Sequence, residues 1–363
     1  MPINTESILP LAITMGDAAG IGPEIIAKAF RDQPGGLRGC FVAGDVETLR
    51  RAALAIVQPG QIALPVAVIT SAQEALTIPP RCIAVLQVVD PLPVVPWGVV
   101  SREAGAFAGQ CVLWAAQAAL HGQVRALVTA PLHKEALHAA GAPFDQFPGH
   151  TELLQDCAAR HLGKPLSEVP VRMMLANEEL RTVLVSIHVS LRQALEAVTF
   201  DNVLQTLRIT HDALSKVLGR PPRIAVAGLN PHAGEGGLFG CEEIDTIAPA
   251  ISAARSEGCQ SSGPWPPDTV FMRARRTPGS PGEFDVVVAM YHDQGLIPVK
   301  YMGVEQGVNV TLGLPFVRTS PDHGTAFDIA GTGRADPSSL LAAIRMAQDL
   351  SATIMGCPSS DVH

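Results

Sequence analysis

LAITMGDAAGIGPEI, residues 11–25, joins a short apolar strand to a glycine-rich turn and the start of a helix. Leu11–Thr14 is apolar enough to form a buried strand, and Pro23 suits the first turn of a helix, where its missing N–H costs nothing. The three glycines of the turn allow the backbone to bend tightly and to approach a ligand closely. Their spacing differs from the GxGxxG turn that binds dinucleotides in Rossmann folds. The segment therefore predicts a strand–loop–helix unit of an α/β fold with a different glycine turn.

Strand-like apolar runs alternate with helical patterns along most of the chain, as in repeated βαβ units. The predicted strands are 39–43, 126–129, 171–175, 182–187, 224–227 and 285–290, and the predicted helices are 45–56, 102–121, 134–139, 151–160, 190–218 (a pair), 242–255 and 336–355. Residues 58–100 are rich in proline and valine and show no clear period. Because 363 residues are many for one hydrophobic core, we expect two domains.

Composition excludes several classes of function. The formal net charge of −8 and the lack of a long Lys/Arg run argue against a nucleic-acid partner. The small basic cluster Arg273, Arg275 and Arg276 is expected to be a solvated loop. Seven scattered cysteines without a CxxC pair predict reduced thiols. The N-terminus has no basic region before its apolar stretch, and no apolar run reaches ~18 residues, so we expect a soluble cytoplasmic protein with no membrane partner.

Three histidines each follow a strand-like run: His188 after RTVLVSI, His232 after RIAVAGLNP and His292 after DVVVAMY. Ligands bind at strand ends in open α/β sheets, so three imidazoles could meet there on one divalent metal and leave positions for a substrate. A histidine near a strand often only bonds to the backbone. The polar, glycine-rich contexts HVSLR, NPHAGEGG and YHDQG favour a functional role. Such a centre predicts an enzyme, either a metal-dependent dehydrogenase or a zinc hydrolase that activates water.

Two segments far apart in the chain resemble the isocitrate and isopropylmalate dehydrogenases. GDAAGIGPE (16–24) is similar to their GDGIGPE, and HGTAFDIAGTGRADP (323–337) is similar to HGSAPDIAGKGIANP. The resemblance implies a three-layer α/β/α fold of two interleaved domains. A dinucleotide-binding domain would comprise 1–131 and 299–363, a metal and dimerisation domain 132–298, and the active site would lie in the cleft between them. NAD or NADP would be bound by His323, Gly324, Thr325, Ala326 and Asp328.

A closer resemblance, to the 4-hydroxythreonine-4-phosphate dehydrogenase family, covers nearly the whole chain. It rests on segments in order, among them VTAPLHKEAL, FPGHTELL, ANEELRTVLVSIHVSL, GLNPHAGEGGLFG, GPWPPDTVF, AMYHDQGLIPVKY and GVNVTLGLPFVRTSPDHGTAFDIAG. It implies metal-dependent NAD(P) oxidation of 4-phosphooxy-L-threonine to 2-amino-3-oxo-4-phosphooxybutanoate. That product decarboxylates to 3-amino-2-oxopropyl phosphate, a precursor in pyridoxal phosphate biosynthesis. The resemblance also implies a homodimer with the active site at the subunit interface.

In that family one divalent metal, zinc, magnesium or cobalt, would bind the residues that match His188, His232 and His292, the last of them from the neighbouring subunit. The substrate contacts would be His150, Thr151, Lys300, Asn309 and Arg318, with Asp268 and Asp293 beside the substrate. The cations suit a phosphate dianion, and the others can donate hydrogen bonds to its oxygens. The acceptor of the hydroxyl proton stays open among Lys300, an aspartate and metal-bound water.

Departures from the family pattern leave the exact substrate open. Ala18 stands in place of the usual proline, Asn177 in place of threonine, and 272–283 resembles an inserted loop. A paralogue that oxidises threonate or erythronate 4-phosphate would retain the same phosphate residues. A dihydrodiol-dicarboxylate dehydrogenase has no phosphate to bind, and a hydrolase or a non-catalytic metal-binding protein leaves the HGTAFDIAG segment unexplained. The choices between NAD and NADP and among the metals also stay open.

Overall fold

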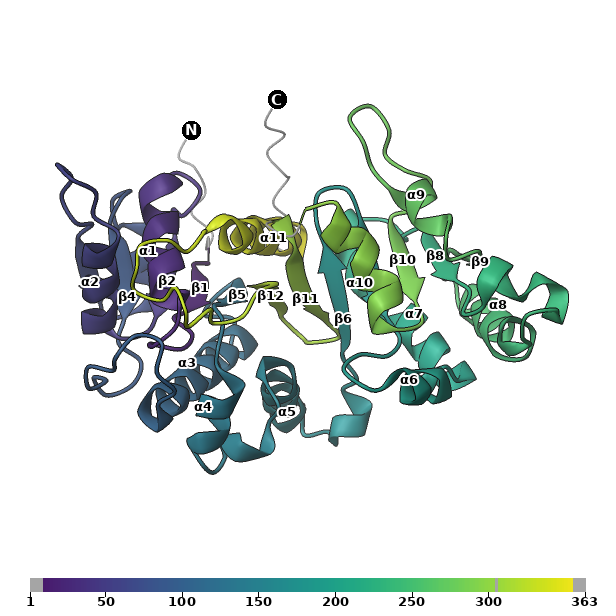
Figure 1. Ribbon diagram of the computed structural model, residues 1–363, viewed down its shortest axis with the longest axis horizontal. Helices are drawn as coiled ribbons and strands as arrows, with labels where there is room; N and C mark the ends of the chain where they lie inside the picture. The colour runs from purple at the N-terminus through teal and green to yellow at the C-terminus, as the bar shows by residue number, and fades with distance from the viewer. Residues whose placement is uncertain (1–8, 304–305, 355–363) are drawn as a thin grey trace. The chain divides into compact units, whose positions relative to one another are not determined.

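The computed structural model describes residues 9–303 and 306–354 and divides into two compact units (Figure 1). The first unit holds the chain up to Pro170 together with Leu314–Gln348. The second holds Val171–Gly313 and the chain from Asp349 onward. The chain thus leaves the first unit and returns to it, as in the interleaved α/β architecture expected from the sequence. Met355 and Cys357, which entered the predictions of a helix end and of reduced thiols, lie outside the described residues.

The first unit is built on parallel strands in the order β3-β4-β2-β1-β5-β12. These are β1 (Leu11–Thr14), β2 (Cys40–Ala43), β3 (Val66–Ile69), β4 (Ile83–Leu86), β5 (Ala126–Thr129) and β12 (Val317–Pro321). Its main helices are α1 (Gly22–Asp32), α2 (Val46–Ala55), α3 (Arg102–Leu120), α4 (Lys134–Ala139), α5 (His150–Leu162) and α11 (Ser338–Ile354). The apolar strand sequences follow from this arrangement, since helices cover both faces of parallel strands.

Figure 1 shows α3, α4 and α5 on one side of these strands and α11 on the other. Alternate strand residues such as Ala12, Phe41 and Leu127 pack against α3, α4 and α5 in one buried cluster. On the other side the hydroxyl of Thr319 in β12 donates to the carbonyl of Ala343 in α11. The first unit therefore has the three α/β/α layers that the sequence predicted.

The second unit has a mixed sheet in the order β11-β6-β7-β10-β8-β9. β6 (Arg172–Ala176) is antiparallel to both β11 (Val308–Leu312) and β7 (Arg181–Leu184), whereas β10 (Val286–Ala289), β8 (Ile224–Ala227) and β9 (Ser261–Trp265) continue in parallel from β7. Its helices are α6 (Leu191–Ala197), α7 (Phe200–Leu218), α8 (Ala248–Ser256), α9 (Val270–Ala274) and α10 (His292–Tyr301), with η4 (Pro231–Gly237) in the loop after β8 and the π-helical η5 (Glu243–Ile247) running directly into α8. The parallel strands β7, β8 and β10 end at one edge, and each of the three histidines follows one of them.

The unit boundaries differ from the expected 131/132 and 298/299. Residues 132–170 belong to the first unit because α5 packs against α3 and its apolar side joins the first unit's core. Residues 299–313 belong to the second because β11 pairs with β6 through five residue positions. Strands β3, β4, β9, β11 and β12 and helices α9 and α10 had no predicted counterpart, since each is short or has a mixed pattern.

The basic cluster is not the solvated loop expected. The guanidinium of Arg273 lies 4.0 Å from the ring centre of Trp265 and is paired with Glu283, and Arg275 pairs with Glu179. These contacts pin the 272–283 segment to the second unit.

Among the described helices, none is both long and apolar enough to cross a bilayer.

Candidate active site

Two polar side chains join the loops that carry the three histidines. The hydroxyl of Ser186 donates to the carbonyl of Met290, which links the segment before His188 to the segment before His292. Gln294 accepts from the N–H of Met290 and donates to the carbonyl of Gly228, both at 2.7 Å. The ends of β7, β8 and β10 are therefore held together by hydrogen bonds within the second unit. Neither residue was predicted from the sequence, although Gln294 lies within the YHDQG segment.

Backbone strain marks two of the three histidines. His188 has a φ of 43° and His232 a φ of 53°, in the left-handed region that branched or bulky L residues seldom occupy. The turn that carries His232 also contains Ala233 and Glu235 at positive φ. Such conformations cost about 1–3 kcal/mol each and persist where the surroundings enforce them, most often at functional sites.

Glu243 enforces the strained turn around His232. Its carboxylate is only 2% exposed and accepts from the N–H groups of Leu229 and Asn230 at 2.7 Å. Burial opposes ionisation of Glu243, but the hydrogen bonds from Asn230 and Leu229 outweigh it and lower the pKa. A Cβ on Gly234 would lie 2.8 Å from the same carboxylate. The NPHAGEGG segment is thus shaped by a buried acid that its own sequence does not reveal.

His188 and His292 come together within one chain, with ring centres 5.6 Å apart. Nδ1 of His292 lies 2.7 Å from Oδ1 of Asp293, which leaves Nε2 for another ligand. A carboxylate in that position fixes the tautomer and orientation of a metal-binding histidine. His232 instead lies near Phe239, and within the described residues no group of three His, Cys, Asp or Glu side chains is arranged to hold a metal. One chain therefore offers two of the three expected ligands in one place.

The other expected residues of the second unit take separate positions. Lys300 lies on α10, two turns after His292, and Asn309 lies on β11 opposite Leu175. Asp268 is exposed in the turn before α9. Asp293 is 72% exposed at its side chain and is engaged with His292. Of the two aspartates, only Asp293 is placed beside an expected metal ligand.

A buried cation in the first unit lies beside the start of α5. Arg318 on β12 is 3% exposed, and its Nη2 donates to the hydroxyl of Thr129 at the end of β5. Burial lowers the pKa of Arg318 to about 10, with Glu152 opposing the shift. Burial and the nearby charge of Arg318 hold the pKa of His150 well below its usual 6.5, so its ring is neutral. A guanidinium, a hydroxyl and a neutral imidazole thus meet at a helix N-terminus, where an anion is favoured.

The expected cofactor loop contacts the glycine turn that opens the chain. The N–H of Ile21 donates to the carbonyl of Thr325, and a Cβ on Gly20 would lie 3.0 Å from the Thr325 side chain. Gly324 is exposed, and no atom lies within 4 Å of the place its Cβ would take. Ala326 has a φ of 40°. The two segments that resemble the isocitrate dehydrogenase group therefore form one surface, with open space over Gly324 that a cofactor could occupy.

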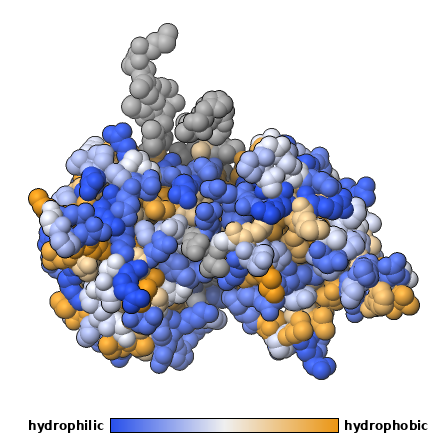
Figure 2. Space-filling model, turned by 45° about the horizontal axis from the view of Figure 1, so that its top comes forward, coloured by the Kyte–Doolittle hydropathy of each residue, from blue (hydrophilic) through white to orange (hydrophobic). Residues whose placement is uncertain are grey.

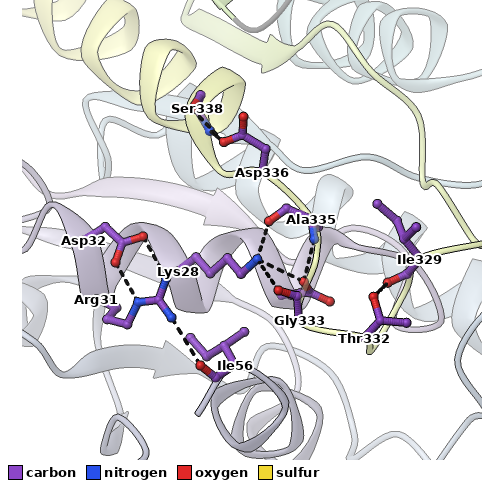
Figure 3. Close-up of polar contacts among 11 residues, drawn as sticks. Lys28, Arg31, Asp32, Ile56, Ile329, Thr332, Gly333, Ala335, Asp336 and Ser338 are labelled. Carbon is purple, nitrogen blue, oxygen red and sulfur yellow. Dashed lines mark hydrogen bonds and ion pairs between the residues drawn. The ribbon is translucent and has the colours of Figure 1, made fainter. Parts of the chain in front are cut away.

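Lys28 fastens the end of this loop to α1 (Figure 3). Its buried ammonium donates to the carbonyls of Gly333 at 2.8 Å and Ala335 at 2.5 Å and lies 3.3 Å from the carboxylate of Glu24. The same Glu24 oxygen accepts from the N–H of Ala335 at 2.8 Å. No sequence pattern had pointed to a role for Lys28. Its spacing of four residues from Glu24 was visible, but their partners lie some 300 positions away.

A second support comes from residues 95–98, in the region that gave no predicted elements. A Cβ on Gly98 would lie 2.6 Å from the carbonyl of Phe327, and one on Gly331 would lie 2.4 Å from the Trp97 ring. The guanidinium of Arg51 covers that ring at 4.6 Å. The cofactor loop is thus confined by three other segments of the first unit.

Comparison with known proteins agrees with this architecture. The family model described as "Pyridoxal phosphate biosynthetic protein PdxA" matches residues 37–347. A 4-hydroxythreonine-4-phosphate dehydrogenase of Beijerinckia indica is 52% identical over 339 residues, which are 91% of this chain and 92% of that protein. A D-threonate 4-phosphate dehydrogenase of Pectobacterium atrosepticum is 42% identical over 94% of this chain and 98% of its own.

Solved structures show the same relationship. The crystal structure of a 4-hydroxythreonine-4-phosphate dehydrogenase from Klebsiella pneumoniae has a TM-score of 0.83 at 42% identity and covers 96% of this chain and 99% of that one. A terephthalate 1,2-cis-dihydrodiol dehydrogenase from Burkholderia xenovorans has a TM-score of 0.62 at 32% identity, with 96% and 98% covered. The family match and these identities confirm the resemblance found in the sequence. The chain belongs to the family of the pyridoxal phosphate biosynthetic protein PdxA.

Proposed function

We propose that this enzyme is a 4-hydroxythreonine-4-phosphate dehydrogenase. It would oxidise the C3 hydroxyl of 4-phosphooxy-L-threonine with NAD or NADP and one divalent metal per site. The β-keto acid formed would lose CO₂ to give 3-amino-2-oxopropyl phosphate. The observation that carries this proposal is the buried Arg318 beside Thr129 and the neutral ring of His150, an arrangement suited to a phosphate dianion.

The residues of the first unit would bind and orient the substrate. Arg318 offers a planar fork to two phosphate oxygens, and a neutral His150 can donate from one ring nitrogen. Thr151 follows it in the first turn of α5, where backbone N–H groups also favour an anion. From the second unit, Lys300 and Asn309 are proposed as further contacts. Burial of Arg318 excludes water from part of this site, which strengthens its attraction for phosphate.

The metal would be held by His188, His232 and His292, and when bound it would lower the pKa of the substrate hydroxyl and stabilise the alkoxide. His188 and His292 fit this role because they are adjacent in one chain and Asp293 orients the second ring. We propose His232 as the ligand from a second subunit, in place of the His292 that the family resemblance implies, because no ring contact joins His232 to this pair within the described residues. Imidazole ligands with an open position suit zinc or cobalt better than magnesium, which prefers oxygen ligands.

Exposed apolar side chains beside the histidines support a homodimer. Leu191 on α6 is 61% exposed, Leu238 after the His232 turn 73%, and Ile297 on α10 63%. Figure 2 shows apolar patches within one mainly hydrophilic face of the molecule. A second copy that covered them would bury apolar area next to the metal ligands, as in obligate dimers. The substrate, a small phosphorylated hydroxy acid, would then bind at a site completed by the partner chain.

Subunit mixing tests which histidine crosses between chains. His188→Ala and His232→Ala proteins, each inactive alone, should recover activity when their subunits are exchanged, because one heterodimer site regains all three ligands. His188→Ala with His292→Ala should stay inactive, since both ligands would come from the same chain. Recovery in the second mixture and not in the first would overturn this arrangement.

Substrate comparison tests the reaction. Reduced nicotinamide would be followed at 340 nm with 4-phosphooxy-L-threonine, threonate 4-phosphate and erythronate 4-phosphate, each also without its phosphate. We expect the highest kcat/KM for the amino acid phosphate and little turnover of dephosphorylated compounds. The second candidate, a sugar-acid phosphate dehydrogenase, is favoured by the Pectobacterium relative, and a higher kcat/KM for threonate 4-phosphate would select it.

A further inference from the structure

Asp285 occupies the edge of the second unit's sheet opposite the three histidines. It immediately precedes β10, and its side chain is only 3% exposed. Arg220 donates to both carboxylate oxygens at 2.8 and 2.9 Å, and Arg223 donates through its backbone N–H, Nε and Nη2 at 2.7, 3.2 and 3.1 Å. These five donors use the roughly four lone-pair sites of a carboxylate. Asp285 therefore has no acceptor capacity left for further guanidinium groups.

Two more arginines lie at the same edge. Arg181 begins β7, which pairs with β10, and Arg276 donates its backbone N–H to the carbonyl of Glu179 two residues before Arg181. Arg276 comes no nearer than 4.0 Å to the Asp285 carboxylate, and the Glu179 carboxylate is paired with Arg275. Within the described residues, Nη1 of Arg181 is buried without a hydrogen-bond acceptor. Nη1 of Arg181 thus lacks an acceptor, and Arg276 has only a long contact with the Asp285 carboxylate.

The charges at this edge do not balance. Burial lowers the pKa of Arg181 to about 10, and the positive charge of Arg276 lowers it further, while Asp285 and Asp349 oppose the shift. Burial likewise lowers the pKa of Arg276, Asp285 opposes this shift, and repulsion from Arg223 and Arg220 adds to it. Four guanidinium groups therefore face two carboxylates among the described residues. The excess of two positive charges matches the charge of a dianion. The side chains of Arg276 and Arg223 are 29% and 39% exposed, so a solute can reach them.

We propose that Arg181 and Arg276, with Arg223 beside them, form a binding site for a phosphate-type dianion at the edge of the second unit opposite the histidines. Planar guanidinium groups bind phosphate oxygens in pairs, and an anion between Arg181 and Arg276 would give Nη1 of Arg181 an acceptor and Arg276 a closer one. The ligand class is inorganic phosphate or a small phosphate ester. This site is separate from Arg318 and does not depend on the proposed reaction.

Phosphate titration by calorimetry in a chloride buffer of constant ionic strength tests the proposal. The Arg318→Ala background removes the candidate substrate site, so the remaining phosphate binding reports on the site at Arg181, Arg223 and Arg276. We expect this background to bind about one phosphate per chain and to gain thermal stability with phosphate. Arg276→Gln in the same background should weaken binding at least about tenfold, as the loss of one charge-assisted contact predicts.

Arg275→Gln is the matched control, because its partner is Glu179 and it should leave phosphate affinity unchanged. Arg181→Gln supplies a second variant on the other side of the site and should reproduce the loss. If the Arg318→Ala protein binds no phosphate, or if Arg276→Gln and Arg181→Gln both bind it like their parent, the proposal is overturned. Failure of the substrate site would appear differently, as unchanged phosphate binding upon Arg318→Ala in the otherwise native chain.

Discussion

The first unit and the second unit build their candidate sites in opposite ways. In the first, Arg318, Glu24 and Lys28 are buried and engaged with the backbone or hydroxyl groups of their own chain. In the second, His188 and His232 are exposed and stand on strained backbone. The first site is preorganised by burial, and the second presents exposed imidazoles for the metal and second subunit proposed above. Substitutions should therefore act through folding and substrate affinity in the first unit and through metal and subunit binding in the second.

The largest expected effect lies in the second unit. His292→Ala would remove an expected metal ligand, so metal affinity and activity should fall by more than about 100-fold, beyond the losses typical of residues that only orient a ligand. The exposed side chain should leave folding intact. Metal content by elemental analysis and the Tm of the metal-free protein would check both parts. Normal metal content in His292→Ala would show that His292 is not a metal ligand and that the second unit does not act through metal binding at this residue.

Arg318→Lys tests preorganisation in the first unit. A lysine keeps the charge and loses the planar fork, so kcat/KM for the phosphorylated substrate should fall by about 10–100-fold, the value of one or two charge-assisted hydrogen bonds. Steady-state kinetics with separate variation of substrate and NAD(P) would show the loss in the substrate KM. An equal rise in the NAD(P) KM would argue against a phosphate role for Arg318.

Lys28→Met should separate folding from chemistry. It leaves Glu24 buried without its cation, so the free energy of unfolding should fall by about 3 kcal/mol, and the loosened loop should raise the KM for NAD(P). The double variant Glu24→Gln/Lys28→Met removes both charges and should be less destabilised than Lys28→Met alone. Denaturant unfolding of the native protein, the single variant and the double variant would measure this. A double variant that is less stable than Lys28→Met would contradict the stabilising role of the Lys28–Glu24 pair.

Gly324→Ala sharpens the placement of the dinucleotide. Because the structure leaves open space around its Cβ, the substitution should keep stability and raise the KM for NAD(P) several-fold if a cofactor packs on the backbone there. Gly35→Ala is the matched control, since its Cβ also meets no atom within 4 Å and it lies far from this loop in sequence. Unchanged cofactor affinity in Gly324→Ala would move the dinucleotide away from the loop.

The smallest expected effect is the pH dependence carried by His150. Its folded pKa lies below the ordinary 6.5, so the unfolded chain takes up a proton first and stability is lost as pH falls below 6.5. Relative to His150→Gln, the substrate-free native protein should lose about 1 kcal/mol between pH 6.5 and 5.5. Denaturant unfolding at both values would test it. A parallel pH dependence in the two proteins would show that the ring is not held neutral.

Sequence patterns predicted much of the fold. The α3 and α4 helices and the β5 and β8 strands were predicted to within a residue, because long or strongly apolar segments carry a clear local period. The short strands β3 and β4 were missed because four residues within a proline-rich stretch show too little period. The histidines and the glycine turn were visible for the same reason as the main elements, since each is a local pattern of residue types.

By itself the sequence determined the α/β class, the family resemblance and the residue types at the candidate site. Only the tertiary structure decided that His188 and His292 are adjacent, that Gln294 and Glu243 hold the loops, and that Lys28 fastens a loop 305 positions away. It also decided that four arginines gather around Asp285. These contacts join residues far apart in the chain, and nothing in the local pattern around either partner specifies the distance to the other.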